Sequence, residues 1–340
     1  MTGAFSAGGV IDLPPVAPSR GTLVFSHANG FPAGTYRHLF EVWQAAGWRV
    51  LAVERYGHDP AFPVTSNWPR LRDQLIALVD ARVDTRLNEG QKGHVRHEGQ
   101  DRPEGQEGQE GQEMRERNSQ RAPVVLVGHS LGGYLSLLAA CRRPGLAQGV
   151  VLLDSPVVAG WRAHGVQVAK ATGLIKRVSP GRVSQTRRRH WPSAEEALHH
   201  FASKSLFSRW APGVLQDYVR SGIEPDPEQG GVRLAFDRAV ETRIYNTLPH
   251  HFSSLLRRHP PACPVHYLGG TRSTEGRHVG MAMTRALTHG RIGWMEGTHL
   301  YPMERPDETA RAVLDALKGM GAEAAASPAG SPPEPPQSGS

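Results

Sequence analysis

Cysteine is scarce in this chain, with only Cys141 and Cys263 among 340 residues. Two cysteines form one disulfide at most, which excludes the disulfide framework that stabilises many small secreted proteins. Cys141 falls in an apolar stretch, where we expect a buried, reduced thiol. The first residues also lack a basic segment followed by a long apolar run, so the sequence predicts no signal peptide.

Long hydrophobic runs are absent as well. No apolar stretch reaches the roughly 20 residues that a membrane-spanning helix needs. The chain is nevertheless long enough to bury a full hydrophobic core. We therefore expect a soluble, cytoplasmic protein that has no membrane partner.

The charge of the chain is basic, with a formal net charge of +7, but no motif typical of nucleic-acid binding accompanies it. The basic residues are dispersed, apart from the run Arg187-Arg188-Arg189 and a few neighbours. A solvated basic face is the interpretation that we favour, and we expect no nucleic-acid partner. Attraction of anionic substrates to this patch is the alternative.

Large apolar side chains are almost missing between residues 88 and 121, where the tripeptide Gln-Glu-Gly occurs at 106–108 and again at 109–111. Such a segment cannot bury enough surface to offset the entropy of ordering, so it is predicted to be a disordered surface insertion. We also expect a flexible leader at residues 1–19 and a disordered tail, rich in Pro, Gly, Ser and Ala, at residues 319–340.

The stretch around Ser130 carries the strongest functional signal. Val124–Val127 is a short β-branched run typical of a buried strand, and an apolar stretch from Tyr134 to Cys141 predicts a helix. Between them, Gly128-His129-Ser130-Leu131-Gly132 matches the G-x-S-x-G pattern of a nucleophile elbow. The glycines are needed because side chains there would collide with the neighbouring strand or helix. The start of the following helix directs free N–H groups and the positive end of its dipole toward developing negative charge.

Strands and helices alternate over most of the rest of the chain. Strand patterns lie at 22–26, 48–53, 124–127, 149–154, 264–268 and 291–295, and helical patterns at 36–46, 69–83 and 306–317. This alternation predicts an α/β fold with a mostly parallel sheet and helices on both faces. Residues 159–258 interrupt it with helical patterns alone. We interpret them as an inserted helical lid between core segments 20–158 and 259–318.

The chain resembles the α/β-hydrolase superfamily, specifically its lid-bearing branch, over nearly all of residues 20–318. Asn29-Gly30-Phe31-Pro32 is similar to the family's His-Gly-x-Pro oxyanion loop, with Asn29 in place of the usual histidine. Residues 55–59 resemble the loop after the next strand. Glu296-Gly297-Thr298-His299 resembles the loop that delivers the catalytic histidine.

The resemblance implies a catalytic role for each of these parts. Ser130 would be the nucleophile, and His299, which follows the last predicted strand, would be the base that takes its proton. His129 lies inside the elbow, where we expect it to pack against the oxyanion loop. The oxyanion hole would consist of the backbone N–H groups of Phe31 and Leu131.

The acid that should orient His299 is less clearly marked. Most of the family carries an aspartate in the loop after the penultimate strand, but residues 269–275 contain none, and Arg272 or Ser273 holds the usual position. Asp154, at the end of the strand after the elbow helix, is one substitute, although a strand-end aspartate also commonly caps a loop. Glu275 is the other, although it could equally be the first-turn acid of a helix. We favour Asp154 as the catalytic acid, with Glu275 as the alternative.

These features predict a serine hydrolase that cleaves a small to medium carboxylic ester or thioester through an acyl-enzyme. A C–C bond hydrolase or cofactor-free haloperoxidase-like enzyme on the same residues is an alternative, and a non-catalytic binding protein of the same fold is another. No cofactor motif occurs. Metal binding has little support, because the pairs His199-His200 and His250-His251 are adjacent, and neighbours on a helix point about 100° apart.

Overall fold

The computed structural model describes residues 9–83, 122–157, 185–249, 252–275 and 280–322. The predicted disordered insertion at 88–121, the first residues of the predicted lid and most of the predicted tail lie outside these residues. Cys141 is buried and free, as expected. None of the helices within the described ranges is long and apolar enough to cross a membrane.

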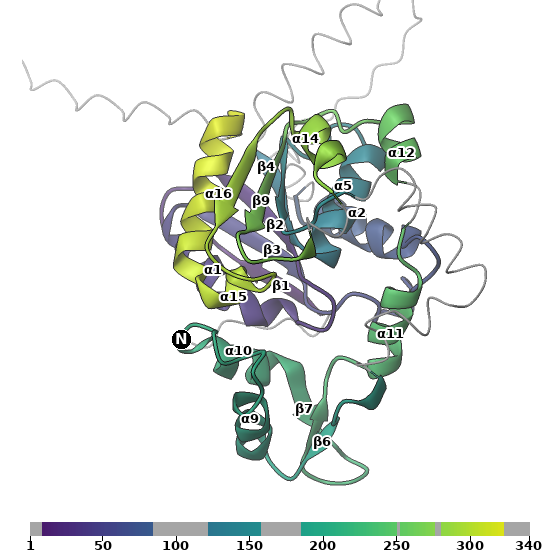
Figure 1. The fold of residues 1–340 in the computed structure, drawn as a ribbon, viewed down its shortest axis with the longest axis vertical. Helices are drawn as coiled ribbons and strands as arrows, with labels where there is room; N and C mark the ends of the chain where they lie inside the picture. The colour runs from purple at the N-terminus through teal and green to yellow at the C-terminus, as the bar shows by residue number, and fades with distance from the viewer. Residues whose placement is uncertain (1–8, 84–121, 158–184, 250–251, 276–279, 323–340) are drawn as a thin grey trace, which may run out of the picture.

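A seven-stranded sheet forms the centre of the fold (Figure 1). Its spatial order is β1-β3-β2-β4-β5-β9-β10, and every neighbouring pair is parallel except β1 with β3. The strands are β1 (Val10–Leu13), β2 (Gly21–Ser26), β3 (Trp48–Val53), β4 (Val124–His129), β5 (Gly149–Leu153), β9 (Val265–Gly270) and β10 (Ile292–Met295). Strands β2 to β5 are buried along their whole length, which explains their continuous apolar sequences.

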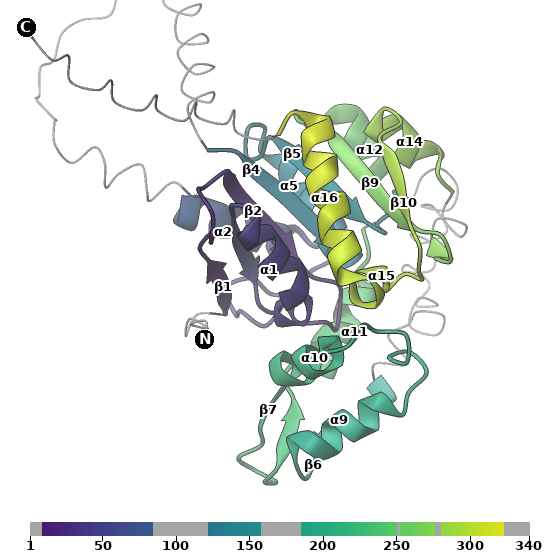
Figure 2. The same cartoon turned by 90° about the vertical axis from the view of Figure 1, so that its left-hand side faces the viewer.

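Helices cover both faces of this sheet, as the alternating pattern predicts (Figures 1 and 2). Helices α1 (Arg37–Ala45) and α16 (Pro306–Met320) pack together on one face, where Trp43 Nε1 donates to the carbonyl oxygen of Ala310 at 3.1 Å. Helices α2 (Pro69–Val83) and α5 (Leu131–Arg142) lie on the other. Helix α14 (Ala282–Thr288) connects β9 to β10, and the short helices η1 (Ala33–Tyr36) and α15 (Tyr301–Glu304) follow β2 and β10.

Strand β1 corrects one expectation, because residues 10–13 were assigned to the flexible leader. They form an antiparallel edge strand on β3, with Val10 opposite Val53 and Leu13 opposite Val50. Two contacts stabilise it. Ile11 is buried, and Asp12 forms an ion pair of 2.6 Å with Arg49. Four residues are too few for an alternating pattern to separate an edge strand from a loop.

The segment between β5 and β9 is not purely helical, which is a second correction. Besides α9 (Ala194–Ala202), α10 (Val214–Gly222), α11 (Arg238–Asn246) and α12 (Phe252–Arg258), it contains a three-stranded antiparallel sheet. Its strands are β6 (His190–Trp191), β8 (Val232–Leu234) and β7 (Ile223–Pro225), in that spatial order. Strands of two or three residues carry no readable period, so the sequence pattern could not reveal them.

An aromatic cluster attaches this inserted segment to the loop after β2. Phe201, Phe207, Trp210 and Tyr218 form mutual ring contacts and are all buried. Phe31 joins them, with ring centroids 5.9 Å from Trp210 and 5.8 Å from Tyr218. Such contacts between large aromatic rings anchor the segment over the loop that precedes η1. Figure 2 shows α9 and α10 beyond the end of the central sheet, with α10 nearer to α15 and α9 farther out.

Candidate active site

Ser130 lies at the sharp turn between β4 and α5, where its backbone adopts φ 55° and ψ −115°. This conformation is strained for a residue that has a Cβ, and the surrounding structure holds it in place. Ser130 N–H donates to the carbonyl oxygen of Leu153 at 3.0 Å, and the Ser130 carbonyl oxygen accepts from the hydroxyl of Ser155 at 2.9 Å. A Cβ on Gly132 would lie 1.9 Å from the carbonyl oxygen of Ser26, which explains the glycine. The backbone is therefore the strand–turn–helix that the sequence pattern predicts.

The topology brings Asp154 and His299 to the same edge of the sheet as Ser130. Ser130 follows β4, Asp154 follows β5 and His299 follows β10, and the carboxyl ends of parallel strands share one edge. His299 lies beside the elbow, because its carbonyl oxygen accepts a hydrogen bond of 2.8 Å from Nε2 of His129.

Asp154 is the acid that contacts His299. Its Oδ2 atom lies 2.6 Å from His299 Nδ1. Three further donors hold this carboxylate, which is 2% exposed: Gly270 N–H at 3.0 Å, the Tyr267 hydroxyl at 3.3 Å and the Ser273 hydroxyl. Ser273 is, with Arg272, one of the two residues at the loop position where the resemblance leads us to expect an aspartate, and its hydroxyl donates to Asp154.

Glu275, the alternative acid, does not make this contact. Its backbone N–H donates to the Ser273 hydroxyl at 3.2 Å. No hydrogen bond joins its carboxylate to His299 within the residues that the structure describes, although its charge acts on the imidazole. Of the two candidates, only Asp154 is placed to orient the ring.

The two partners shift each other's pKa. Burial disfavours the charged imidazole of His299, but the hydrogen bond to Asp154 and the charges of Asp154 and Glu275 outweigh it and raise the pKa of His299. Burial likewise opposes ionisation of Asp154, but its hydrogen bonds with His299, Ser273 and Gly270 lower its pKa. Because Nδ1 of a neutral His299 donates to Asp154, its Nε2 carries the free lone pair that a general base needs.

The two backbone N–H groups predicted to form the oxyanion hole differ in whether they already donate to another acceptor. Leu131 N–H begins α5, and no acceptor for it is found among the described residues. Phe31 N–H donates to the carbonyl oxygen of Ala28 at 3.1 Å, which closes a tight turn. Phe31 can therefore serve an oxyanion only by sharing this hydrogen or by opening the turn.

Two buried histidines connect the loops around the elbow, and their partners fix their tautomers. His27 Nε2 accepts from Tyr56 N–H at 2.9 Å, so Nδ1 carries the proton and donates to the Ala28 carbonyl oxygen at 2.8 Å. His129 Nε2 donates to the His299 carbonyl oxygen, so Nδ1 accepts from the Tyr36 hydroxyl at 2.7 Å. Burial lowers the pKa of His27 to about 4 and that of His129 to about 3. His129 thus links Tyr36, at the end of η1, to the loop that carries His299.

The lowered pKa values of His27 and His129 predict that the folded protein becomes less stable in mild acid. Their pKa values in the folded protein lie below the unfolded value of 6.5, so the unfolded chain takes up protons first as the pH falls. The contribution of the two neutral histidines to the free energy of unfolding is therefore fully present above pH 6.5 and declines below it. Between pH 7 and pH 5 each histidine should lower the free energy of unfolding by about 2 kcal/mol, measured by urea unfolding. A free energy that stays constant over this interval would contradict the assignment, and His27→Gln should remove the share that His27 contributes.

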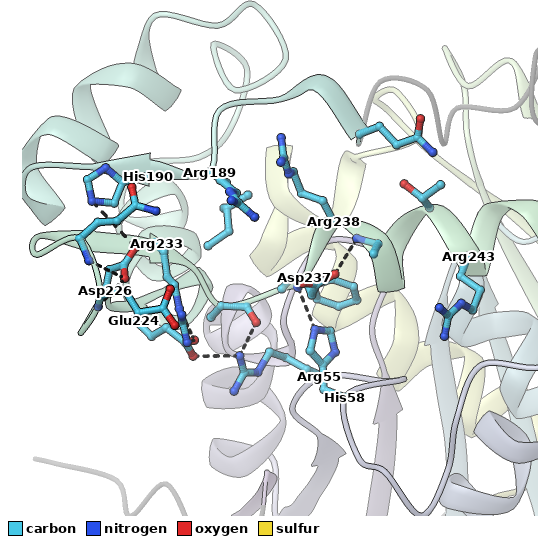
Figure 3. Close-up of a pocket in the computed structure, with 18 of the residues that line it drawn as sticks. Arg55, His58, Arg189, His190, Glu224, Asp226, Arg233, Asp237, Arg238 and Arg243 are labelled. Carbon is cyan, nitrogen blue, oxygen red and sulfur yellow. Dashed lines mark hydrogen bonds and ion pairs between the residues drawn. The ribbon is translucent and has the colours of Figure 1, made fainter.

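A large cavity lies elsewhere, between the inserted segment and the loop after β3 (Figure 3). It measures about 1020 Å³, and its walls include Arg55, His58 and the outer face of α11 with Arg238 and Arg243. His58 Nε2 accepts from Asp237 N–H at 2.9 Å at the start of that helix. None of the residues after β4, β5 or β10 described above lines this cavity. Within the described ranges, no three His, Cys, Asp or Glu side chains gather closely enough to hold a metal ion.

Comparisons of the structure with solved structures give matches over most of the chain. An E-2-(acetamidomethylene)succinate hydrolase matches with a TM-score of 0.62 at 18% identity, covering 91% of this chain and 94% of its own. The thioesterase domain from the curacin biosynthetic pathway matches with a TM-score of 0.59 at 17% identity, covering 90% and 94%. MenH from S. aureus matches with a TM-score of 0.57 at 15% identity, covering 92% and 99%. At these identities the likeness shows the fold alone.

In comparisons by sequence, no curated protein matches the chain. The family model described as "Alpha/beta hydrolase family" matches residues 23–312, which span both parts of the core and the inserted segment. The chain therefore belongs to the alpha/beta hydrolase family.

Proposed function

We propose that this protein is a serine hydrolase that cleaves a small to medium carboxylic ester or thioester through an acyl-enzyme on Ser130. The observation that carries the proposal is the 2.6 Å contact between Asp154 and His299 at the sheet edge where the strained Ser130 turn lies. Hydrolases, among them a thioesterase domain, occur among the proteins of similar fold, which supports the same reaction class.

The reaction would proceed in two acyl transfers. Ser130 Oγ attacks the carbonyl carbon of the substrate while its proton passes to Nε2 of His299. Asp154 stabilises the resulting imidazolium. The negative oxygen of the tetrahedral intermediate is held by Leu131 N–H and by Phe31 N–H once the Phe31 turn opens. The imidazolium then protonates the departing alkoxide or thiolate, and water, deprotonated by His299, hydrolyses the acyl-enzyme.

Turnover of a graded series of p-nitrophenyl esters and matched thioesters tests this proposal. We expect saturable hydrolysis of at least one acyl length by the full chain, and background rates from protein inactivated with a fluorophosphonate. A chain that neither hydrolyses these substrates nor reacts with the fluorophosphonate would be a binding protein. Labelling without turnover would instead favour another reaction of the same residues, such as C–C bond hydrolysis.

A further inference from the structure

An ion pair between a buried carboxylate and a partly buried guanidinium lies next to the oxyanion loop and has no part in the reaction steps above. Glu241, on α11, is 6% exposed. Its carbonyl oxygen accepts from Asn29 Nδ2 at 3.1 Å, and its Oε1 atom would lie 2.8 Å from a Cβ placed on Gly30. Gly30 immediately precedes Phe31. The carboxylate of Glu241 therefore rests against the loop that would bind the substrate's carbonyl oxygen.

Arg187 is the partner of this carboxylate, but the two groups are poorly aligned. Arg187 Nη2 lies 2.7 Å from Glu241 Oε2, yet neither atom makes a hydrogen bond of acceptable geometry. Arg187 Nε is likewise shielded from solvent and has no acceptor among the described residues. Nε and Nη2 form one edge of the guanidinium, and this edge matches the two oxygens of a carboxylate. Nε has no acceptor and Nη2 has a misaligned one, which is costly for donors shielded from water, so the edge is suited to an anion that meets both donors with better geometry.

Neighbouring residues hold Arg187 beside the oxyanion loop. Its guanidinium interacts with the hydroxyl of Tyr218, whose ring lies 5.8 Å from that of Phe31 between centroids. Its carbonyl oxygen accepts from Arg238 Nη1 at 2.8 Å. Figure 3 shows Arg238 projecting from the start of α11. The position of Arg187 is thus tied both to the helix that carries Glu241 and to the aromatic contact of the oxyanion loop.

We propose that Arg187 is a specificity-determining residue that selects esters or thioesters bearing a carboxylate, which accepts two hydrogen bonds from its Nε and Nη2. This inference rests on the proposed function and names the substrate class of the same site. The misaligned contact with Glu241 gives way to the substrate's carboxylate. Burial raises the pKa of Glu241 despite the opposing charge of Arg187, so Glu241 is readily neutralised when a second carboxylate arrives.

A matched pair of substrates tests this selection. Monomethyl glutarate carries a carboxylate, and dimethyl glutarate is its neutral counterpart. The kcat/KM for monomethyl glutarate, divided by that for dimethyl glutarate, should fall about tenfold or more in Arg187→Met, because hydrogen bonds to a charged group are lost.

Arg189→Met is the control. Arg189 is exposed and lines the cavity of Figure 3, so its replacement removes the same charge without touching the loop. Arg187→Lys keeps the charge but not the two-pronged edge and should restore only part of the ratio. Glu241→Gln should raise the ratio.

The outcomes separate the inference from the proposed function. An unchanged ratio in Arg187→Met, or an equal change in Arg189→Met, would overturn the role of Arg187. If no ester is hydrolysed, the proposed function fails, and calorimetric binding of monomethyl glutarate to Ser130→Ala protein decides the inference. Binding that is lost in the Ser130→Ala, Arg187→Met double variant supports it, and equal binding by both proteins overturns it. Arg187→Lys repeats the comparison if circular dichroism shows that Arg187→Met is not folded.

Discussion

Replacement of Ser130 by alanine is expected to reduce ester hydrolysis by a factor of about 10⁴ to 10⁶, leaving only the residual catalysis that substrate binding and the oxyanion donors supply. The reason is the position of its hydroxyl group. Ser130 immediately precedes α5, in a strained backbone conformation at the edge of the sheet where Asp154 and His299 meet. Removal of Oγ leaves the oxyanion donors intact but removes the atom that would form the acyl bond.

Ser136→Ala is the matched control for this variant. Ser136 lies in α5, the helix that follows Ser130, and is fully buried, and its Oγ has no hydrogen-bond partner among the described residues. Its removal should leave kcat and KM within about twofold of the original values, since surplus buried hydroxyls contribute little. Initial rates with a p-nitrophenyl ester, alongside thermal unfolding of both variants, make the comparison. Equal activity of Ser130→Ala and the original protein would refute the assignment of Ser130 as the nucleophile.

The second large effect is expected from Asp154→Asn, which should lower kcat by about 10³- to 10⁴-fold. An amide can donate to Nδ1 and so favour the wrong tautomer, in which Nε2 carries the proton. It also removes the charge that stabilises the imidazolium. Glu275→Gln is the matched control and should stay within a few-fold of the original kcat, because Glu275 contributes charge but no hydrogen bond to His299.

The pH profile of the same variants provides an independent check. His299 must be neutral to act as a base, and its pKa is raised above 6.5, so activity should fall as the pH drops through a midpoint above 6.5. The charge of Asp154 helps to raise this pKa, so Asp154→Asn should move the midpoint to lower pH. A smaller shift in the same direction is expected for Glu275→Gln. Loss of kcat in Glu275→Gln alone, with no effect in Asp154→Asn, would reverse the assignment of the acid.

The sequence predicts the elbow, the buried strands and the position of His299 well, because the signals for these parts are local. The elbow around Ser130 is encoded by steric needs of Gly128 and Gly132 within one turn, and the buried strands by continuous apolar runs. The position of His299 follows from its place after the last strand. The sequence favours Asp154 as the acid but leaves Glu275 open as the alternative, since both follow strands at the same edge. The choice depends on where Ser273 and Gly270 direct their donors in three dimensions.

Other parts of the site depend on contacts that the motifs in the sequence do not specify. The turn that engages Phe31 N–H is not encoded by the motif around Asn29. The pair between Arg187 and Glu241 joins residues from different parts of the inserted segment. In the sequence, Arg187 is one member of a basic run for which a solvated face is the simplest interpretation. Arg187 is partly buried beside Glu241 and Tyr218, whereas its neighbours Arg188 and Arg189 are exposed.

Peptide mapping of the protein after reaction with a fluorophosphonate tests the central claim most directly. Such a reagent forms a stable bond only with a serine that is activated by a correctly oriented base, and it needs no knowledge of the natural substrate. We predict one adduct per chain, located on Ser130 by tandem mass spectrometry, and much slower labelling in Asp154→Asn. Ester turnover without any adduct on Ser130, or with the adduct on another residue, would contradict the account.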